Sequence, residues 1–184
     1  MAATKHAELI KNDSIDYLTT ALLQLLETTD FNDIKISQLV KRAGVSRMAF
    51  YRNFETLEDV LRNYFQPLID ALFDDIIENV SQEDKLMRLS QFLGMLEEPI
   101  QLSIQRHYEY IIREIFFANM TRLYENDPRV QAVTTVKKHY WVGFMSAGVY
   151  NIWRDWIVGG KKESLDEIRE LIAALQTGSF TALK

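Results

Sequence analysis

The sequence contains no cysteine, and this absence removes several kinds of site at once. Without cysteine the chain cannot form a disulfide framework, a thiol nucleophile or a metal site built on thiolates. Glycine and proline are also scarce, with 7 and 3 residues among 184, which indicates few turns. The length allows one or two small domains, each with a buried core. A composition of 47% hydrophobic and 26% charged residues is typical of a folded globular chain and excludes a disordered one.

Long hydrophobic runs are also missing. The longest stretch without Lys, Arg, Asp or Glu covers residues 139–153, which is shorter than the roughly 20 residues that cross a bilayer. We interpret it as a buried helix. The N-terminus leads into charged residues instead of the apolar segment of a secretory signal. We therefore expect a cytoplasmic protein with no membrane partner.

Apolar residues recur at helical spacing along almost the whole chain. Ile15, Leu18, Leu22 and Leu26 form one such stripe, and no segment shows the alternation of a half-buried strand. Pro67 falls inside a helical pattern and is expected to kink or break it. The pattern predicts an all-α protein of about nine helices, including one long helix over residues 128–158. We place the domain boundary near Pro67, with residues 1–65 in a first domain and residues 66–184 in a second.

One acid-free window stands out against the net charge of −5. Residues 35–54 contain five basic side chains and no acidic one. Within this window Gly44 suits the left-handed end of a helix over residues 36–43. Ser46 is positioned to cap a second helix over residues 47–53. Two short helices joined by a tight glycine turn form a helix-turn-helix.

Such a hairpin has two interpretations. A helix-turn-helix can place its second helix in the major groove of DNA, where phosphates attract cations and repel carboxylates. Arg47 and Tyr51 are four residues apart and share a helix face, and arginine can hydrogen-bond guanine. Ser37 and Thr56 lie at expected helix N-termini, where phosphate can bind. A solvated hairpin without a ligand would show the same spacing.

The residues of this window also carry a family resemblance. Residues 34–54 read IKISQLVKRAGVSRMAFYRNF, with an Ala-Gly-Val-Ser turn followed by an aromatic residue and Tyr-x-x-Phe. This run closely resembles the DNA-binding signature of the TetR family of bacterial transcriptional regulators. The resemblance covers about residues 10–65 by motif and the rest of the chain by helix count. It implies a homodimer with an N-terminal three-helix DNA-binding domain and a larger helical domain that binds an effector and dimerises.

Carried over by position, the resemblance implies that the second helix of the hairpin faces DNA and that Tyr51 reaches a phosphate. The complete predicted DNA-binding set is Lys35, Ser37, Ser46, Arg47, Met48, Ala49, Tyr51, Arg52, Asn53 and Thr56. Two positions depart from the family pattern, since position 35 is usually Thr or Ser and position 57 is usually Lys. Lys35 can compensate electrostatically, whereas Leu57 removes a phosphate contact and favours looser DNA binding.

The second half of the chain is rich in aromatic residues, and an apolar pocket with a few polar groups would suit a small effector. Plain core packing is the alternative reading of these side chains. The candidate effector-pocket residues are His107, Tyr110, Arg113, Phe117, Trp141 and Phe144.

Small residues four apart on the long helix let a partner helix approach closely, and the last two helices form the dimer bundle of the family. Packing within one chain would explain the same residues. The predicted dimer interface consists of Gly143, Ala147, Tyr150, Leu171 and Leu175.

Nothing in the sequence indicates an enzyme, a metal site or a cofactor. The three histidines show no i, i+4 pairing, and neither a phosphate-binding loop nor a dinucleotide-binding glycine pattern is present. The prediction is a ligand-responsive repressor that binds a palindromic DNA operator as a homodimer and responds to an unidentified small molecule. The alternatives are an activator or effector-independent regulator of the same fold, and a helical protein-interaction module that has lost DNA binding.

Overall fold

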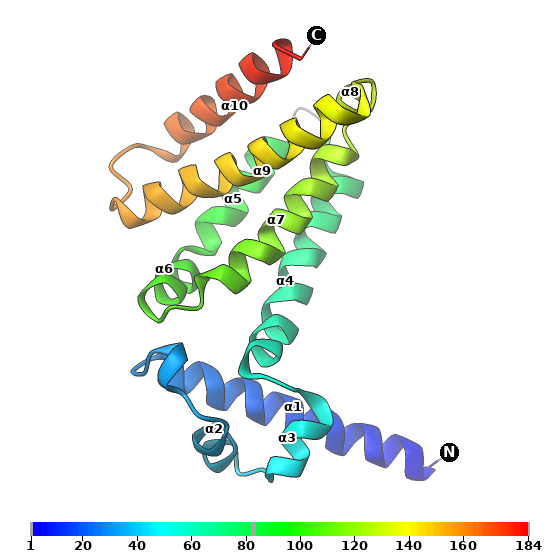
Figure 1. Ribbon diagram of the computed structural model, residues 1–184, viewed down its shortest axis with the longest axis vertical. Coiled ribbons are helices and arrows are strands. Elements are labelled where there is room, and N and C mark those ends of the chain that lie inside the picture. The colour runs from blue at the N-terminus through cyan, green and yellow to red at the C-terminus, as the bar shows by residue number, and fades with distance from the viewer. Residues whose placement is uncertain (1, 82–83, 184) are drawn as a thin grey trace. The chain divides into compact units, whose positions relative to one another are not determined.

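The computed structural model describes residues 2–81 and 84–183, and this part of the chain contains only helices, turns and loops (Figure 1). The predicted all-α class is therefore confirmed. A 3-10 helix at Phe31–Asp33 accompanies ten α-helices. These are α1 (Ala2–Leu26), α2 (Ile36–Ala43), α3 (Arg47–Asn53), α4 (Leu57–Asn79), α5 (Lys85–Met95), α6 (Glu97–Gln105), α7 (Glu109–Glu125), α8 (Pro128–Gln131), α9 (Thr135–Val158) and α10 (Leu165–Thr181).

The helices form two compact units. The N-terminal unit runs up to Pro67 and also includes Leu102–Ile112. The C-terminal unit consists of Leu68–Gln101 together with the residues from Arg113 onward. The sequence prediction placed every residue after 65 in the second domain. In the structure, Leu102–Ile112 instead belongs to the N-terminal unit.

Aromatic packing explains why the segment Leu102–Ile112 belongs to the N-terminal unit. The Tyr108 ring is buried between Phe31 and Phe65, with centroid distances of 6.1 and 6.3 Å. Backbone and side-chain hydrogen bonds add to this contact. Phe31 donates its N–H to the Arg106 carbonyl at 2.9 Å, and Arg106 Nη2 donates to the Glu27 carbonyl at 2.7 Å. Residues distant in sequence thus complete the core of the N-terminal unit.

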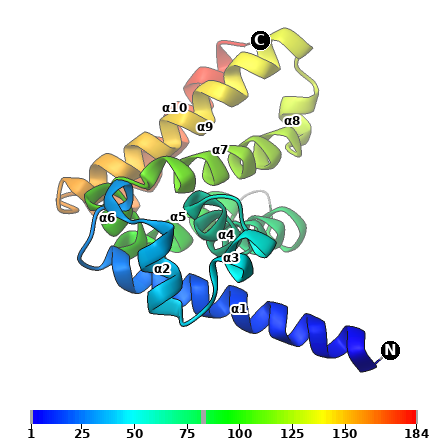
Figure 2. The same ribbon diagram turned by 60° about the horizontal axis from the view of Figure 1, so that its bottom comes forward.

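The rest of the N-terminal unit is a three-helix arrangement. Helices α2 and α3 pack against α1 and against each other (Figures 1 and 2). The apolar stripe predicted for the first helix supplies one side of the core, where Leu18, Leu22 and Leu26 are fully buried. Leu39 of α2 and Phe50 of α3 fill the other side. This packing leaves the opposite faces of α2 and α3 in solvent.

The C-terminal unit is held by aromatic rings and by the antiparallel pair α9 and α10 (Figures 1 and 2). Phe116 of α7 packs against Phe73 of α4 at 5.6 Å and against Tyr150 of α9 at 5.4 Å. Ser164 caps the start of α10, because its hydroxyl accepts from the Glu167 N–H while the Glu167 carboxylate accepts from the Ser164 N–H.

Two helix boundaries differ from the sequence prediction. Helix α4 continues through Pro67, which lies on its exposed side, where water can bind the carbonyl that loses its helical partner. The buried side chains of Phe65 and Ile69 hold the helix on either side of the proline. The long helix predicted over residues 128–158 is divided into α8 and α9, because Thr134 adopts extended backbone angles and starts a new helix.

Candidate nucleic-acid interface

The turn between α2 and α3 has the geometry that its residues predict. Gly44 ends α2 in the left-handed region, with φ of 67° and ψ of 23°. The Ser46 hydroxyl then accepts the backbone N–H of Ala49 at 3.1 Å and caps α3. Both predicted signals are confirmed, so a glycine end and a serine cap fix the angle at which α3 leaves the turn.

Helix α3 has a buried side and a solvent side. Phe50 is completely buried and stacks edge-on against the Tyr51 ring at 5.2 Å. On the solvent side Met48 is 84% exposed and Tyr51 is 60% exposed. Arg47 is exposed at the start of the same helix. An exposed methionine and tyrosine beside an arginine form a surface that can contact bases and phosphates together.

Further polar side chains surround this surface. Lys35, Ser37 and Lys41 are exposed on or just before α2, and Arg52 is exposed at the end of α3. The Lys35 backbone N–H donates to the Gln38 side-chain oxygen at 2.7 Å, and Lys35 itself is exposed. The part of the sequence that forms this surface has no carboxylate, so its field favours a polyanion.

Two predicted DNA-facing residues lie deeper than the others. Asn53 is half-buried and donates its side-chain N–H to the Ala49 carbonyl at 2.8 Å, and Ala49 is itself half-buried. The Asn53 amide is therefore used within its own helix. The sequence could not show this, because an asparagine at the last position of a helix can equally point outward.

The start of α4 is acidic, which bears on the predicted phosphate contact at Thr56. The Asp59 carboxylate accepts the backbone N–H groups of Thr56 at 2.8 Å and Glu55 at 3.0 Å. Desolvation opposes ionisation of Asp59, but these hydrogen bonds and the attraction of Arg62 outweigh it and lower its pKa. Two backbone N–H groups, at Glu55 and Thr56, are therefore bound to a carboxylate, and the DNA contact at Thr56 stays a prediction.

The six predicted effector-pocket residues do not come together. His107 and Tyr110 belong to the N-terminal unit, where His107 lies 3.5 Å from Asp30 and Tyr110 donates to Glu58. The imidazole of His107 is exposed and its backbone has a φ of 63°, so it forms part of a turn and not of a pocket. Periodicity cannot reveal this, because the helical pattern continues through the turn that separates α6 from α7.

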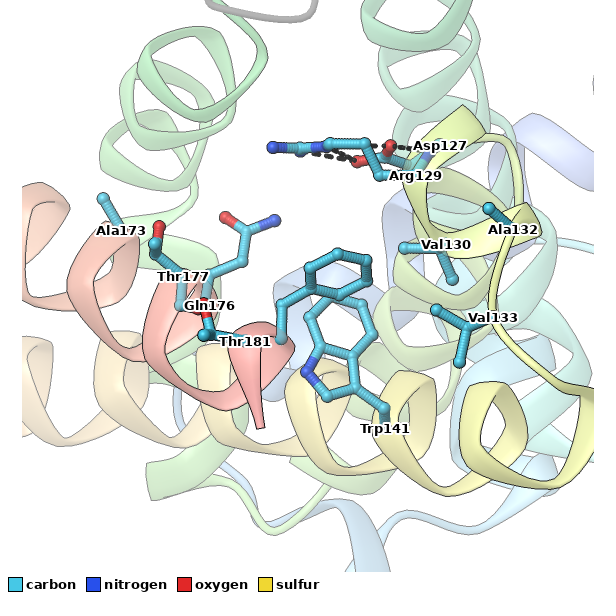
Figure 3. Close-up of a pocket in the computed structure, with 11 residues that line it drawn as sticks. Asp127, Arg129, Val130, Ala132, Val133, Trp141, Ala173, Gln176, Thr177 and Thr181 are labelled. Atoms are coloured by element: carbon cyan, nitrogen blue, oxygen red, sulfur yellow. Dashed lines mark hydrogen bonds and ion pairs between the residues drawn. The ribbon is translucent and has the colours of Figure 1, made fainter. Parts of the chain in front are cut away.

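The other four effector candidates lie in the C-terminal unit at three places. Arg113 and Phe117 of α7 line a hollow of about 350 Å³ that also touches α9. Trp141 lines a different hollow of about 520 Å³ between α8, α9 and α10 (Figure 3). Phe144 is exposed on α9 and lines neither of them.

The predicted dimer residues fall on two sides of their helices. Leu171 and Leu175 of α10 are 48% and 46% exposed, and Ala147 of α9 is exposed too. Gly143 is half-buried, with open space where a Cβ would lie. Tyr150 is buried against Phe116, so it belongs to the core of the unit. Sequence reasoning missed three further exposed apolar side chains of α9, which are spaced four apart and could have been found by that spacing. They are Val136, Tyr140 and Phe144.

The described residues contain neither a metal-binding group nor a membrane-spanning helix. No group of three or more His, Asp or Glu side chains among them is arranged to hold a metal ion. None of the helices in this part of the chain combines the length and the hydropathy needed to cross a bilayer.

Comparisons with known proteins bear on this geometry. No family model matches the chain. The HTH-type transcriptional regulator EthR of Mycolicibacterium smegmatis (strain ATCC 700084 / mc(2)155), a TetR-family regulator, is 42% identical over 60 residues. That match covers 31% of this chain and only 28% of the relative. Among solved structures, the dihydroxyacetone kinase operon activator DhaS has a TM-score of 0.54 at 17% identity, and the match covers 93% of this chain and 98% of that chain.

The chain is TetR-like. The short relative supports this statement by sequence, and the solved structure supports it by fold. The sequence match confirms the stated resemblance of this TetR-like chain, and the solved structure adds a likeness of fold alone.

Proposed function

We propose that this TetR-like protein is a transcriptional regulator that binds a palindromic DNA operator as a homodimer. The observation that supports this most is the solvent face of α3, where Arg47, Met48 and Tyr51 are exposed within a segment, residues 35–54, that carries five cations and no carboxylate. The similarity to EthR, whose name describes an HTH-type transcriptional regulator, points in the same direction.

The proposed contacts follow from the chemistry of each side chain. Helix α3 enters the major groove, where Arg47 hydrogen-bonds a guanine and Met48 contacts apolar base edges. Tyr51 and Arg52 reach the adjacent phosphates from the same helix. Lys35 and Ser37 hold the backbone on the α2 side, which fixes the register of the recognition helix.

The dimer is proposed to form through the exposed apolar sides of α9 and α10. Leu171 and Leu175 on α10, with Val136, Tyr140 and Phe144 on α9, offer apolar area that water would otherwise cover. A two-fold axis buries the same patch on both subunits. It would present two recognition helices about one turn of DNA apart, roughly 34–36 Å, which matches a palindromic site.

Regulation is proposed to occur by a shift between conformers in the cytoplasm. A small molecule that binds best to a conformer with wrongly spaced recognition helices lowers operator affinity and relieves repression. The fold neighbour DhaS is by name an operon activator, so a protein of this fold can also activate transcription. Repression and activation share operator binding as their first step, and a reporter gene placed behind the selected operator separates them.

The first experiment selects genomic DNA fragments on the purified full chain and titrates the best fragment by fluorescence anisotropy at several salt concentrations. We expect a palindromic site bound at least about 10³-fold more tightly than random DNA. Weak, sequence-blind binding that disappears at physiological salt would contradict the proposal and favour the protein-interaction module.

A matched pair of variants then locates the interface. Arg47→Glu should abolish operator binding, because it places a carboxylate among phosphates and removes the base contact. Lys162→Glu changes the net charge by the same amount on an exposed residue after α9 and should leave binding almost unchanged. Equal effects of the two variants would mean that net charge alone, and not α3, decides binding.

A further inference from the structure

The hollow between α8, α9 and α10 lies within the C-terminal unit and is lined by both apolar and polar side chains (Figure 3). Its volume of about 520 Å³ lies within the roughly 300–1,000 Å³ of small-molecule sites. One side is apolar and the other carries polar groups. We call this space the α8–α10 hollow.

Two aromatic rings form the apolar side. Trp141 of α9 packs edge-on against Phe180 of α10 at 5.3 Å and against Tyr124 of α7 at 5.1 Å. The indole N–H of Trp141 donates to the Ser179 hydroxyl at 3.0 Å. The polar atom of this indole is therefore satisfied inside the protein, and the ring offers the hollow an apolar surface held in a fixed orientation.

An ion pair forms the polar side. Asp127 is buried and caps α8 by accepting the Arg129 backbone N–H at 2.9 Å. Its carboxylate also accepts Nε of Arg129 at 3.1 and 3.2 Å and Nη2 at 2.6 Å. Desolvation opposes ionisation of Asp127, but the hydrogen bonds and charge of Arg129 outweigh it and lower its pKa. The carboxylate is thus ionised and its lone pairs are engaged.

An arginine guanidinium carries five N–H donors. The side-chain bonds to Asp127 described above run through Nε and Nη2 of Arg129. Figure 3 shows the Arg129 side chain extending over the hollow, on the same side as the Gln176 amide and opposite the ring of Trp141. An acceptor placed between Arg129 and Gln176 would meet N–H groups from both.

A small second hollow of about 60 Å³ adds a further cation. It shares Asp127, Arg129 and Gln176 with the α8–α10 hollow and is lined by Lys85 of α5 as well. Lys85 is close enough to Asp127 to help lower its pKa. Among the described residues that line the two hollows, two cations face one carboxylate, so the junction has a net charge of one positive unit.

We propose that the α8–α10 hollow binds a small flat monoanion of the aromatic carboxylate class. The ring lies against Trp141 and Phe180, and the carboxylate accepts from Nη1 of Arg129 and from Gln176. This proposal rests on the ligand-responsive part of the proposed function and adds the chemical class of the ligand and its place in the fold.

The hollow and the proposed dimer surface lie on opposite sides of α10. Successive residues of a helix are rotated by about 100°, which puts Leu171 and Leu175 on one side and Phe180 about half a turn away. Dimerisation through the leucines therefore leaves the hollow accessible in both subunits.

The test measures binding of two probes to the full chain by isothermal titration calorimetry without DNA. The probes are 2-naphthoate and the uncharged 2-naphthamide, which have the same ring system. We expect 2-naphthoate to bind at least about tenfold more tightly, because only the anion meets the positive junction. Equal affinities, or no heat from 2-naphthoate at millimolar concentration, would overturn the proposal.

Two substitutions separate binding from a structural role of the ion pair. Arg129→Gln should remove the preference for the anion and leave 2-naphthamide binding within about twofold. Asp127→Asn keeps a residue that caps helices well and removes the competing charge, so it should tighten 2-naphthoate several-fold. A merely structural pair would instead weaken both probes in both variants. Arg113→Gln, in the hollow beside α7, is the matched control and should change neither affinity.

Operator titrations with and without 2-naphthoate distinguish a failure of the proposed ligand site from a failure of the proposed ligand response. Naphthoate binding without any change in operator affinity would contradict the proposed ligand response and leave the site standing. If the chain binds its operator but neither 2-naphthoate nor 2-naphthamide, the proposed ligand site is wrong and the proposed DNA binding still stands.

Discussion

The helix-turn-helix and the α8–α10 hollow differ in how far apart along the chain their parts lie. Residues 35–54 form the proposed DNA-facing surface, and its turn, cap and core residues follow one another directly. The hollow takes residues from α8, α9 and α10, and its neighbouring cavity adds Lys85 of α5. A site made from one short segment is set by local rules, whereas a site made from several helices depends on how those helices pack.

Removing the core residue of the short segment should have the largest effect. Phe50→Ala deletes a fully buried ring and should lower the free energy of unfolding by about 3–5 kcal/mol, together with operator binding. Chemical denaturation followed by circular dichroism measures the loss. Met48→Ala, on the exposed side of the same helix, should stay within about 0.5 kcal/mol. Similar losses for both would mean that α3 is not packed as described.

A charge on the exposed face of α10 tests the proposed dimer interface in the C-terminal unit. Leu171→Glu should raise the dimer dissociation constant about tenfold or more, because a two-fold interface contains the substitution twice. Sedimentation velocity at several concentrations reads the change. Leu68→Glu, at an equally exposed leucine of α4, is the control and should not affect assembly. If both variants remain dimeric, the interface lies elsewhere.

Two glycines, one in each unit, should respond in opposite directions to the same substitution. Gly44→Ala forces an alanine into the left-handed region and should cost roughly 1–2 kcal/mol. Gly94→Ala lies within α5 with open space around the new Cβ and should gain about 0.5–1 kcal/mol. Thermal melting of both variants makes the comparison. Equal shifts would contradict the left-handed turn between α2 and α3.

The smallest effect is expected at the position that departs from the family pattern. Leu57→Lys adds a cation at the start of α4 and should tighten operator binding a few-fold at low salt, with a salt dependence steeper by about one phosphate contact. The acidic groups of Glu58 and Asp59 beside it limit the gain. Anisotropy titrations between low and physiological salt give the slope. An unchanged slope would show that residue 57 does not reach DNA.

The sequence predicts the first of the two regions well. Gly44, Ser46 and the buried Phe50 act through backbone angles, a cap and helical spacing, and all three depend on neighbours within a few residues. Local spacing also accounts for the cap at Ser164. The Thr-x-x-Asp spacing at Thr56 and Asp59 likewise signals a capping box, and the Asp59 carboxylate accepts the Thr56 N–H in the structure.

The sequence does not predict the α8–α10 hollow, because its residues come together only through the packing of several helices. His107 and Trp141 both look like pocket residues in sequence, but a left-handed turn directs one of them to Asp30 and helix packing directs the other into the hollow. The sequence predicts a kink or a break at Pro67, yet α4 continues through it without a break, with buried side chains on either side. Each outcome depends on contacts between distant residues, which spacing along the chain does not contain.

The segment Leu102–Ile112 has a consequence for the order in which the protein is made. Tyr108 fills the core of the N-terminal unit between Phe31 and Phe65. A ribosome that has released only the first three helices has therefore delivered the proposed DNA-reading surface without all of the core beneath it. Because domains generally fold as units during synthesis, this unit reaches its final packing only after Ile112 has emerged. The nascent chain thus completes the core beneath the proposed DNA-reading surface only when more than half of it, including α5 and α6, is already outside the ribosome.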